Sequence, residues 1–301
     1  MSRRYSCSTL QRNRESGAAE RDSASMLDSQ EREWTDDHAL LTATMRDVGN
    51  LAMSYFGRHV HAWQKEGGTP VSDADIAVDR HLRQRLGAAR PEYGWLSEET
   101  EDDTARLARR RVWVIDPIDG TRAFLEGVPH FCHAVALVED RRPVLAVLYN
   151  PATDEFYEAI AGHGARLNGH SIRTSGRQEI EGCRMAAFGP MFQHPAWREP
   201  WPAMQIIQRD SVAYRLALVA SGQADAAFGL NPKNDWDLAA ADLIVHEAGG
   251  LVSSHDGKLL AYNGIETVQR SFLAAGPAMH AALLARIGHV KLRPPPARQD
   301  A

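Results

Sequence analysis

Cysteine is scarce in this sequence of 301 residues, which contains only three. They stand at positions 7, 132 and 183, an odd number with no C-x-x-C spacing. This pattern excludes a disulfide framework and a thiolate zinc site, because both need cysteines in sets. We therefore expect a reducing, cytoplasmic setting. We also expect no secretory signal, because the N-terminus lacks an apolar core segment.

An excess of basic residues and long apolar runs are also missing. Lys and Arg number 34 against 39 Asp and Glu, which gives a formal net charge of −5. This balance excludes a general nucleic-acid binder, because nothing in it attracts phosphate backbones. Apolar runs such as Ala134–Val138 are far shorter than the roughly 18 residues that a membrane span needs. The remaining composition, 44% hydrophobic and 24% charged, is that of an ordinary globular protein.

The composition changes at both ends of the chain. Residues 1–34 are rich in Arg, Ser and Glu with almost no apolar periodicity, so we expect a disordered extension there. Residues 291–301 contain three consecutive prolines and are expected to form a short tail. Between these ends we expect two packed halves, an N-terminal one over 35–178 and a C-terminal one over 179–290.

Apolar periodicity predicts helices and short strands between the two ends. The 3.6-residue pattern indicates helices over residues 37–56, from 72 onward, and over 212–221, 236–248 and 278–287. Short apolar runs predict strands over 112–115, 134–138, 144–149, 155–160 and 224–229, with further strands near 251 and over 271–274. Antiparallel hairpins followed by strand–helix alternation predict an α+β fold of layered halves.

The most informative segment is Trp113–Phe124, in which Asp-Pro-Ile-Asp-Gly-Thr occupies residues 116–121. We expect an apolar strand to end at Asp116, because Pro117 prevents the strand from continuing. A tight turn would then aim Asp116 and Asp119 at one point and place the carbonyl of Ile118 between them. Hard oxygen ligands of this kind are what Mg²⁺ prefers. The segment therefore predicts a magnesium site.

Phosphate-binding groups and further acids flank this segment. The backbone N–H groups of Gly120 and Thr121 come at the start of a short predicted helix, where such donors cradle phosphate. Glu98 and Glu99 end a predicted strand upstream, and Asp237 opens a predicted helix downstream. Clustered carboxylates repel one another unless a cation neutralises them. Acids around two or more Mg²⁺ ions form a site for in-line attack of water on phosphorus.

These residues resemble the inositol monophosphatase superfamily. The resemblance rests on Asp-Pro-Ile-Asp-Gly-Thr at 116–121 and on Trp-Asp-Leu-Ala-Ala-Ala-Asp-Leu-Ile-Val-His-Glu-Ala-Gly-Gly at 236–250, and it extends over about residues 36–287. It implies a layered αβαβα sugar-phosphatase-type fold and a Mg²⁺-dependent phosphomonoesterase that uses two or three ions. It also implies a homodimer, because homodimers are common among such relatives.

The resemblance assigns roles to matching residues. The implied metal ligands are Glu98, Asp116, the carbonyl of Ile118, Asp119 and Asp237. Thr121 is implied to orient or deprotonate the attacking water with the help of Asp75, which is chemically reasonable because a lone hydroxyl is a weak base. The residues implied to bind the substrate phosphate are Glu98, Ile118, Asp119, Gly120, Thr121 and Asp237, with Lys65 as a further candidate.

Several of these positions have structural alternatives. Either member of the Glu98–Glu99 pair can serve as the ligand by chemistry alone, and family position favours Glu98. Asp75 also fits the third position of a helix capping box that begins at Ser72, and both roles can hold together. Asp237 can be a helix cap, and Lys65 can be a solvated loop residue.

The substrate is indicated less directly. Ala123 stands where the common family pattern has Asn, as in histidinol-phosphate phosphatases, but Trp236 before Asp237 resembles the inositol-phosphatase and bisphosphate-nucleotidase branches. The stretch 229–235 carries Lys233, which suits a doubly phosphorylated ligand. We therefore favour 3'-phosphoadenosine 5'-phosphate, with inositol 1-phosphate and then histidinol phosphate as alternatives. A non-catalytic binding protein of the same fold is the alternative from another class, although none of the implied ligands is lost.

Overall fold

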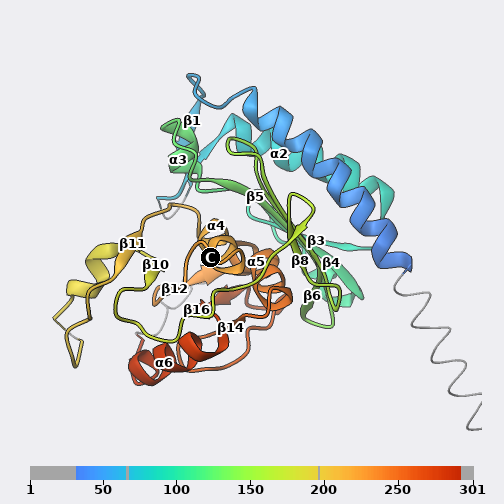
Figure 1. Cartoon of the computed structure of the whole chain (residues 1–301). Coiled ribbons are helices and arrows are strands. Elements are labelled where there is room, and N and C mark those ends of the chain that lie inside the picture. The colour runs from blue at the N-terminus through green and yellow to red at the C-terminus, as the bar shows by residue number, and fades with distance from the viewer. Residues whose placement is uncertain (1–31, 66–67, 196, 293–301) are drawn as a thin grey trace, which may run out of the picture.

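The computed structural model describes residues 32–65, 68–195 and 197–292. The predicted disordered extension over residues 1–34 lies outside the described residues except for 32–34, which belong to the first helix, so its predicted end at 34 is wrong. Most of the predicted tail also lies outside the described residues. The described chain folds into five layers in the order helices, sheet, helices, sheet, helix (Figure 1). The predicted α+β class and its αβαβα layering are confirmed. No helix within the described ranges is long and apolar enough to cross a membrane.

The larger sheet has seven strands in the order β3-β4-β5-β6-β7-β8-β9. Only β3 and β4 pair in parallel; all later neighbours are antiparallel. The strands are β3 (Gly94–Ser97), β4 (Arg111–Asp119), β5 (Cys132–Glu139), β6 (Arg142–Asn150), β7 (Glu155–Ile160), β8 (Ala165–Leu167) and β9 (His170–Ser171). The two residues between β5 and β6, Asp140 and Arg141, have φ values of 49° and 65°, which a tight two-residue hairpin turn requires.

The smaller sheet has five strands in the order β11-β10-β12-β16-β14. β10 pairs in parallel with β11 and with β12, whereas β16 is antiparallel to β12 and β14. The strands are β10 (Arg184–Ala186), β11 (Gln205–Ile207), β12 (Ala226–Gly229), β14 (Leu251–Ser253) and β16 (Phe272–Ala275). The two sheets thus use different parts of the chain, and the domain division at 178/179 stays a prediction.

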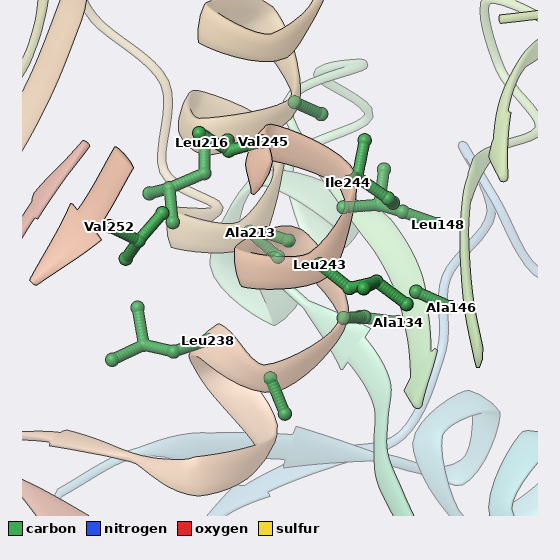
Figure 2. Close-up of a cluster of buried hydrophobic side chains, with 14 of the residues drawn as sticks. Ala134, Ala146, Leu148, Ala213, Leu216, Leu238, Leu243, Ile244, Val245 and Val252 are labelled. Atoms are coloured by element: carbon green, nitrogen blue, oxygen red, sulfur yellow. The ribbon is translucent and has the colours of Figure 1, made fainter. Parts of the chain in front are cut away.

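Both faces of each sheet are buried. A helix over residues 32–53 and α2 (Asp73–Leu82) cover the outer face of the large sheet, against which Trp113 and Ile115 of β4 pack. The inner faces of the sheets enclose α4 (Val212–Ala220) and α5 (Asp235–Glu247). In Figure 2, Leu243 and Ile244 of α5 lie toward Ala146 and Leu148 of the large sheet, and Leu216 of α4 lies toward Val252 of the small sheet. Successive strand residues point to opposite faces, and both faces are covered here, so β4 and β5 contain continuous apolar runs.

The outermost layer is α6 (Pro277–Ile287), which packs on the second face of the small sheet through Met279, Leu283 and Ile287. Shorter elements complete the chain: β1 (Ala62–Gln64), β2 (Pro70–Ser72), a π-helix over Arg83–Gly87, 3-10 helices over Thr104–Ala108 and Gly189–Gln193, α3 (Thr121–Leu125), β13 (Lys233–Asn234) and β15 (Val268–Gln269).

Two sequence predictions need correction. The first helix spans residues 32–53 rather than 37–56. More importantly, the strand expected to stop at Asp116 continues to Asp119. Pro117 lies at an irregularity between β4 and β5, where its missing N–H group does not interrupt the pairing on either side.

Candidate active site

A β-bulge brings the two aspartates of the central motif onto one face. Asp116 lies opposite Ala134 on β5, while Asp119, three positions later, lies opposite Cys132, which is only two positions from Ala134. Without the extra residue on β4, Asp116 and Asp119 would point to opposite faces of the sheet. With it, both share the face of Cys132 and Ala134, which is turned toward α4 and α5.

The bulge is fixed by neighbouring groups. The buried ring of His133 donates a hydrogen bond from Nδ1 to the carbonyl of Pro117, and burial lowers the pKa of His133 to about 4, so the ring is neutral. Gly120 follows with a φ of 96° and is the N-cap of α3. A Cβ atom there would come within 2.8 Å of the carbonyl oxygen of His130, so only glycine fits.

Three carboxylates from distant parts of the chain converge at this bulge. One oxygen each of Glu98, Asp116 and Asp237 lies within 4.8 Å of the others. Glu98 directly follows β3, Asp116 belongs to β4, and Asp237 lies in the first turn of α5. Glu99 is not a member of this group, so the geometry agrees with the preference for Glu98 over its neighbour.

Burial and mutual repulsion raise the free energy of the ionised carboxylates in the metal-free cluster. Burial raises the pKa of Asp116 well above its ordinary value, and the charges of Glu98, Asp119 and Asp237 raise it further. Burial, followed by the charge of Asp119, raises the pKa of Asp237 to about 7. Among the residues that the structure describes, Asp116 Oδ1 is buried and has no hydrogen-bond partner.

This donor set fits a divalent cation. Carboxylate oxygens are the ligands that Mg²⁺ prefers, and an orphaned buried carboxylate oxygen is the atom that such an ion would satisfy. The ion would also offset the repulsion among Glu98, Asp116 and Asp237. The residues present therefore fit magnesium.

Asp119 lies beside the cluster and is held by α4. Its Oδ2 accepts hydrogen bonds from the Ser211 hydroxyl at 2.7 Å and from the Ala213 N–H at 2.6 Å. Burial raises the pKa of Asp119, and these two hydrogen bonds partly offset that effect. Ser211, the N-cap of α4, thus orients an acid 92 positions away in sequence. Sequence reasoning missed Ser211 because no local motif joins it to Asp119.

Thr121 and Asp75 meet as the resemblance implied. The Thr121 hydroxyl lies 3.0 Å from Asp75 Oδ1 and 3.0 Å from the carbonyl of Ile118, so it can donate to either oxygen. Asp75 Oδ2 accepts from the backbone N–H and the hydroxyl of Ser72, which completes the predicted capping box of α2. Asp75 therefore both caps α2 and contacts Thr121. Burial raises the pKa of Asp75, while the Ser72 and Thr121 hydrogen bonds lower it in part.

Two lysines approach the carboxylates. Lys65 Nζ lies 3.2 Å from Glu98 Oε1 and 2.7 Å from Glu99 Oε1, so it is not a freely solvated loop residue. Burial raises the pKa of Glu99 to about 7, although the Lys65 hydrogen bond opposes the shift. Lys233 of β13 directly precedes Asn234, whose backbone N–H donates to Asp237, and the charge of Lys233 partly offsets the rise that burial causes in the pKa values of both Asp119 and Asp237.

Asp237 is fixed by the start of α5. Its Oδ2 accepts from the backbone N–H of Asn234 at 2.8 Å in a second capping box. Asp235, two positions earlier, points elsewhere: it accepts from the Asn263 N–H and the Gln269 side chain and so ties down the 263–269 segment. Asp237 therefore both caps α5 and belongs to the carboxylate cluster.

A model of the inositol monophosphatase family matches residues 34–291. The chain belongs to this family. It is 35% identical to the Nus factor SuhB of Xylella fastidiosa over 228 residues, 72% of this chain and 82% of the relative. It is 32% identical to the histidinol-phosphatase of Chlorobaculum parvum over 262 residues, 85% of this chain and 98% of the relative. Among solved structures, the IMPase of Thermotoga maritima matches with a TM-score of 0.70 and 30% identity, covering 81% of this chain and 94% of that one.

Membership in the inositol monophosphatase family fixes the reaction class. The family consists of magnesium-dependent phosphatases, so this chain is a magnesium-dependent phosphoric monoester hydrolase. The three relatives bear names that point to different roles, so membership in the family does not by itself identify the phosphate ester that this member hydrolyses.

Proposed function

We propose that this protein hydrolyses a small phosphate monoester with water at the cluster of Glu98, Asp116 and Asp237. The observation that supports this is the convergence of three carboxylates, one with an orphaned buried oxygen, beside the hydrogen-bonded pair Thr121 and Asp75. Mg²⁺ would be held by these three acids together with Asp119 and the carbonyl of Ile118. When bound, the metal supplies Lewis-acid activation of water and neutralises charge on the phosphate.

Thr121 and Asp75 are proposed to move the proton of the attacking water. When the Thr121 hydroxyl donates to Asp75, its own oxygen is left as an acceptor for a water proton. As water attacks phosphorus, that proton passes to Thr121 and the hydroxyl proton passes to Asp75. The ester P–O bond breaks, the leaving oxygen takes up a proton from solvent water, and Asp75 releases the proton it accepted to solvent, so that no net proton is gained or lost. The raised pKa of buried Asp75 makes it a better proton acceptor than an exposed aspartate.

The phosphate is proposed to lie against Gly120, Thr121 and Lys65. The N–H groups of Gly120 and Thr121 stand at the start of α3, directly after the bulge. Lys65, which donates to Glu98 and Glu99, brings an ammonium group to the edge of the cluster. A phosphate bound at the acids could pair with the ammonium group of Lys65.

The preferred substrate is proposed to be 3'-phosphoadenosine 5'-phosphate. Lys233 supports it, because this lysine lies beside Asp119 and Asp237 and can pair with a second phosphate. Inositol 1-phosphate is the first alternative, and histidinol phosphate is the next. The names of the Thermotoga maritima and Chlorobaculum parvum relatives favour those two compounds.

A phosphate-release assay with four esters tests the proposal. The panel comprises 3'-phosphoadenosine 5'-phosphate, inositol 1-phosphate, histidinol phosphate and fructose 1,6-bisphosphate, each with Mg²⁺ and with EDTA. We expect Mg²⁺-dependent release with the highest kcat/KM for the adenosine bisphosphate. A higher kcat/KM for another ester reassigns the substrate, and no release from any ester would favour a binding protein of the same fold.

A further inference from the structure

A cavity of about 590 Å³ is lined by Arg215 of α4 and Lys233 of β13, and the backbone of these two elements also donates hydrogen bonds to Asp119 and Asp237. Its wall is formed by the end of β12, by the 3-10 helix Gly189–Gln193 and its flanks, by α4, and by residues 290–292. The acids, Thr121 and Asp75 make no use of this space, and its size is that of a small-molecule site. Lys233 lines the cavity, and the next residue, Asn234, donates its backbone N–H to Asp237, so the wall of the cavity adjoins the acids.

Aromatic side chains dominate one side of the cavity. Phe188, Trp197 and Phe228 all line it. Phe188 is 56% exposed, which is costly for a large apolar ring and is typical of binding surfaces. The wall is also rigid. Trp197 Nε1 donates to the carbonyl of Met191 at 2.7 Å, and Trp201 stacks on Phe228 with ring centroids 5.6 Å apart.

Basic side chains stand on the remaining sides. Arg215 lines the cavity, interacts with Asp119 through its charge, and is held in place by a hydrogen bond from Nε to the carbonyl of Arg209 at 2.6 Å. Lys233 and Lys291 also contribute to the lining. No acidic residue is among the described residues that line this cavity.

We propose that this cavity binds the leaving alcohol of the substrate and selects for a flat ring that is uncharged or anionic. The inference rests on the proposed phosphatase site and adds the chemical class of the leaving group. An aromatic wall stabilises a planar ring by stacking and burial. A neutral polyol would lose hydrogen bonds to water against Phe188 and Trp197. A cationic ring would be repelled by Arg215, Lys233 and Lys291.

Phosphate release from benzyl phosphate and glycerol 2-phosphate, both with Mg²⁺, tests the cavity. Both leaving alcohols are aliphatic at the reacting oxygen, and only the first carries a ring. We expect Phe188→Ala to lower kcat/KM for benzyl phosphate roughly five- to tenfold, mainly by raising KM, and to leave glycerol 2-phosphate within about twofold. Phe188→Tyr should retain the wild-type preference, because it keeps the ring.

The control is Leu259→Ala, which removes an apolar side chain that is 77% exposed and lies outside the cavity lining. Leu259→Ala should leave kcat/KM unchanged for both esters. Equal losses for both esters in Phe188→Ala, or no loss for either, would overturn the cavity assignment and leave the phosphatase site standing. If the wild-type protein released phosphate from no ester at all, the proposed function would fail, and the cavity assignment with it.

Discussion

The hydroxyl of Thr121 lies 3.0 Å from a carboxylate oxygen of Asp75, although 46 positions separate the two residues. Asp75 is locked by the capping box of α2, and Thr121 follows the glycine that closes the bulge of β4. Helix and sheet therefore bring a weak base and its activating carboxylate together at the edge of the acid cluster. Because the two side chains are in direct contact, single and double variants of Thr121 and Asp75 can show whether they act together.

Thr121→Ala should lower kcat by about 10²–10⁴-fold, because it removes the group proposed to accept the water proton. Asp75→Asn should produce a similar loss, and the double variant should be little worse than either single one, because the two act as a unit. Mg²⁺ affinity measured by calorimetry should change little. Thr153→Ala, which removes an exposed hydroxyl that donates to Glu155, is the matched control. An unchanged kcat in Thr121→Ala would remove this residue from the mechanism.

Asp116→Asn and Asp237→Asn should each reduce Mg²⁺-dependent phosphate release to background while the fold stays intact. At pH 8, Asp116→Asn should also raise the Tm of the metal-free protein, because it removes a buried carboxyl whose ionised form is disfavoured by burial and by the charge of Glu98. Circular dichroism and thermal unfolding in EDTA check the fold and the Tm. Substantial turnover in either variant would contradict its place in the metal site.

The metal-free protein should become less stable as pH rises. The pKa of Asp237 is about 7 in the folded chain against an ordinary 3.8, and that of Asp116 is also raised. The folded state therefore holds more protons than the unfolded chain between about pH 4 and pH 7. The stability from these protonated carboxyls is fully present below about pH 4 and is lost as pH rises through about 7.

Thermal unfolding at about pH 5 and pH 8, in EDTA and in saturating Mg²⁺, measures this dependence. The Tm in EDTA should be lower at pH 8 than at pH 5. Mg²⁺ should raise the Tm more at pH 8, because it binds the deprotonated carboxylates. Asp237→Asn should flatten the dependence. An increment from Mg²⁺ that is the same at both pH values would refute the assignment of these carboxyls.

Lys233→Gln tests whether Lys233 binds the second phosphate of the substrate. It should raise KM for 3'-phosphoadenosine 5'-phosphate roughly tenfold and affect inositol 1-phosphate much less, because only the first compound has another anionic group to pair. Lys258→Gln is a suitable control, because this exposed lysine pairs with Asp256 and does not line the cavity. Equal KM changes for the two compounds would argue for a general electrostatic effect instead of recognition of a second phosphate.

Local signals in the sequence predicted much of the site, and long-range ones were out of reach. Ser72 and Asp75 are three positions apart, and the metal-site motif occupies the six consecutive residues 116–121. Each pattern is local, so it can be recognised from the sequence. The bulge at Pro117 could not be predicted from the sequence, because it depends on the register between β4 and β5. A proline by itself indicates the end of a strand.

The same limit explains the contacts that the sequence did not reveal. Ser211 reaches Asp119 from α4, and Lys65 reaches Glu99 from a loop, through pairings that no spacing encodes. The aromatic wall of the cavity combines Phe188, Trp197 and Phe228 from three segments that meet only in the folded chain. Trp201, which is partly buried, stacks on Phe228 and supports this wall.

The most direct test of the metal site is anomalous scattering from a crystal of this protein soaked in Mn²⁺. We predict a peak in contact with carboxylate oxygens of Glu98, Asp116 and Asp237, with Lys65 displaced from Glu98, and no peak at Asp235. A soaked crystal without anomalous density among these three acids, in a protein that still releases phosphate, would contradict the account.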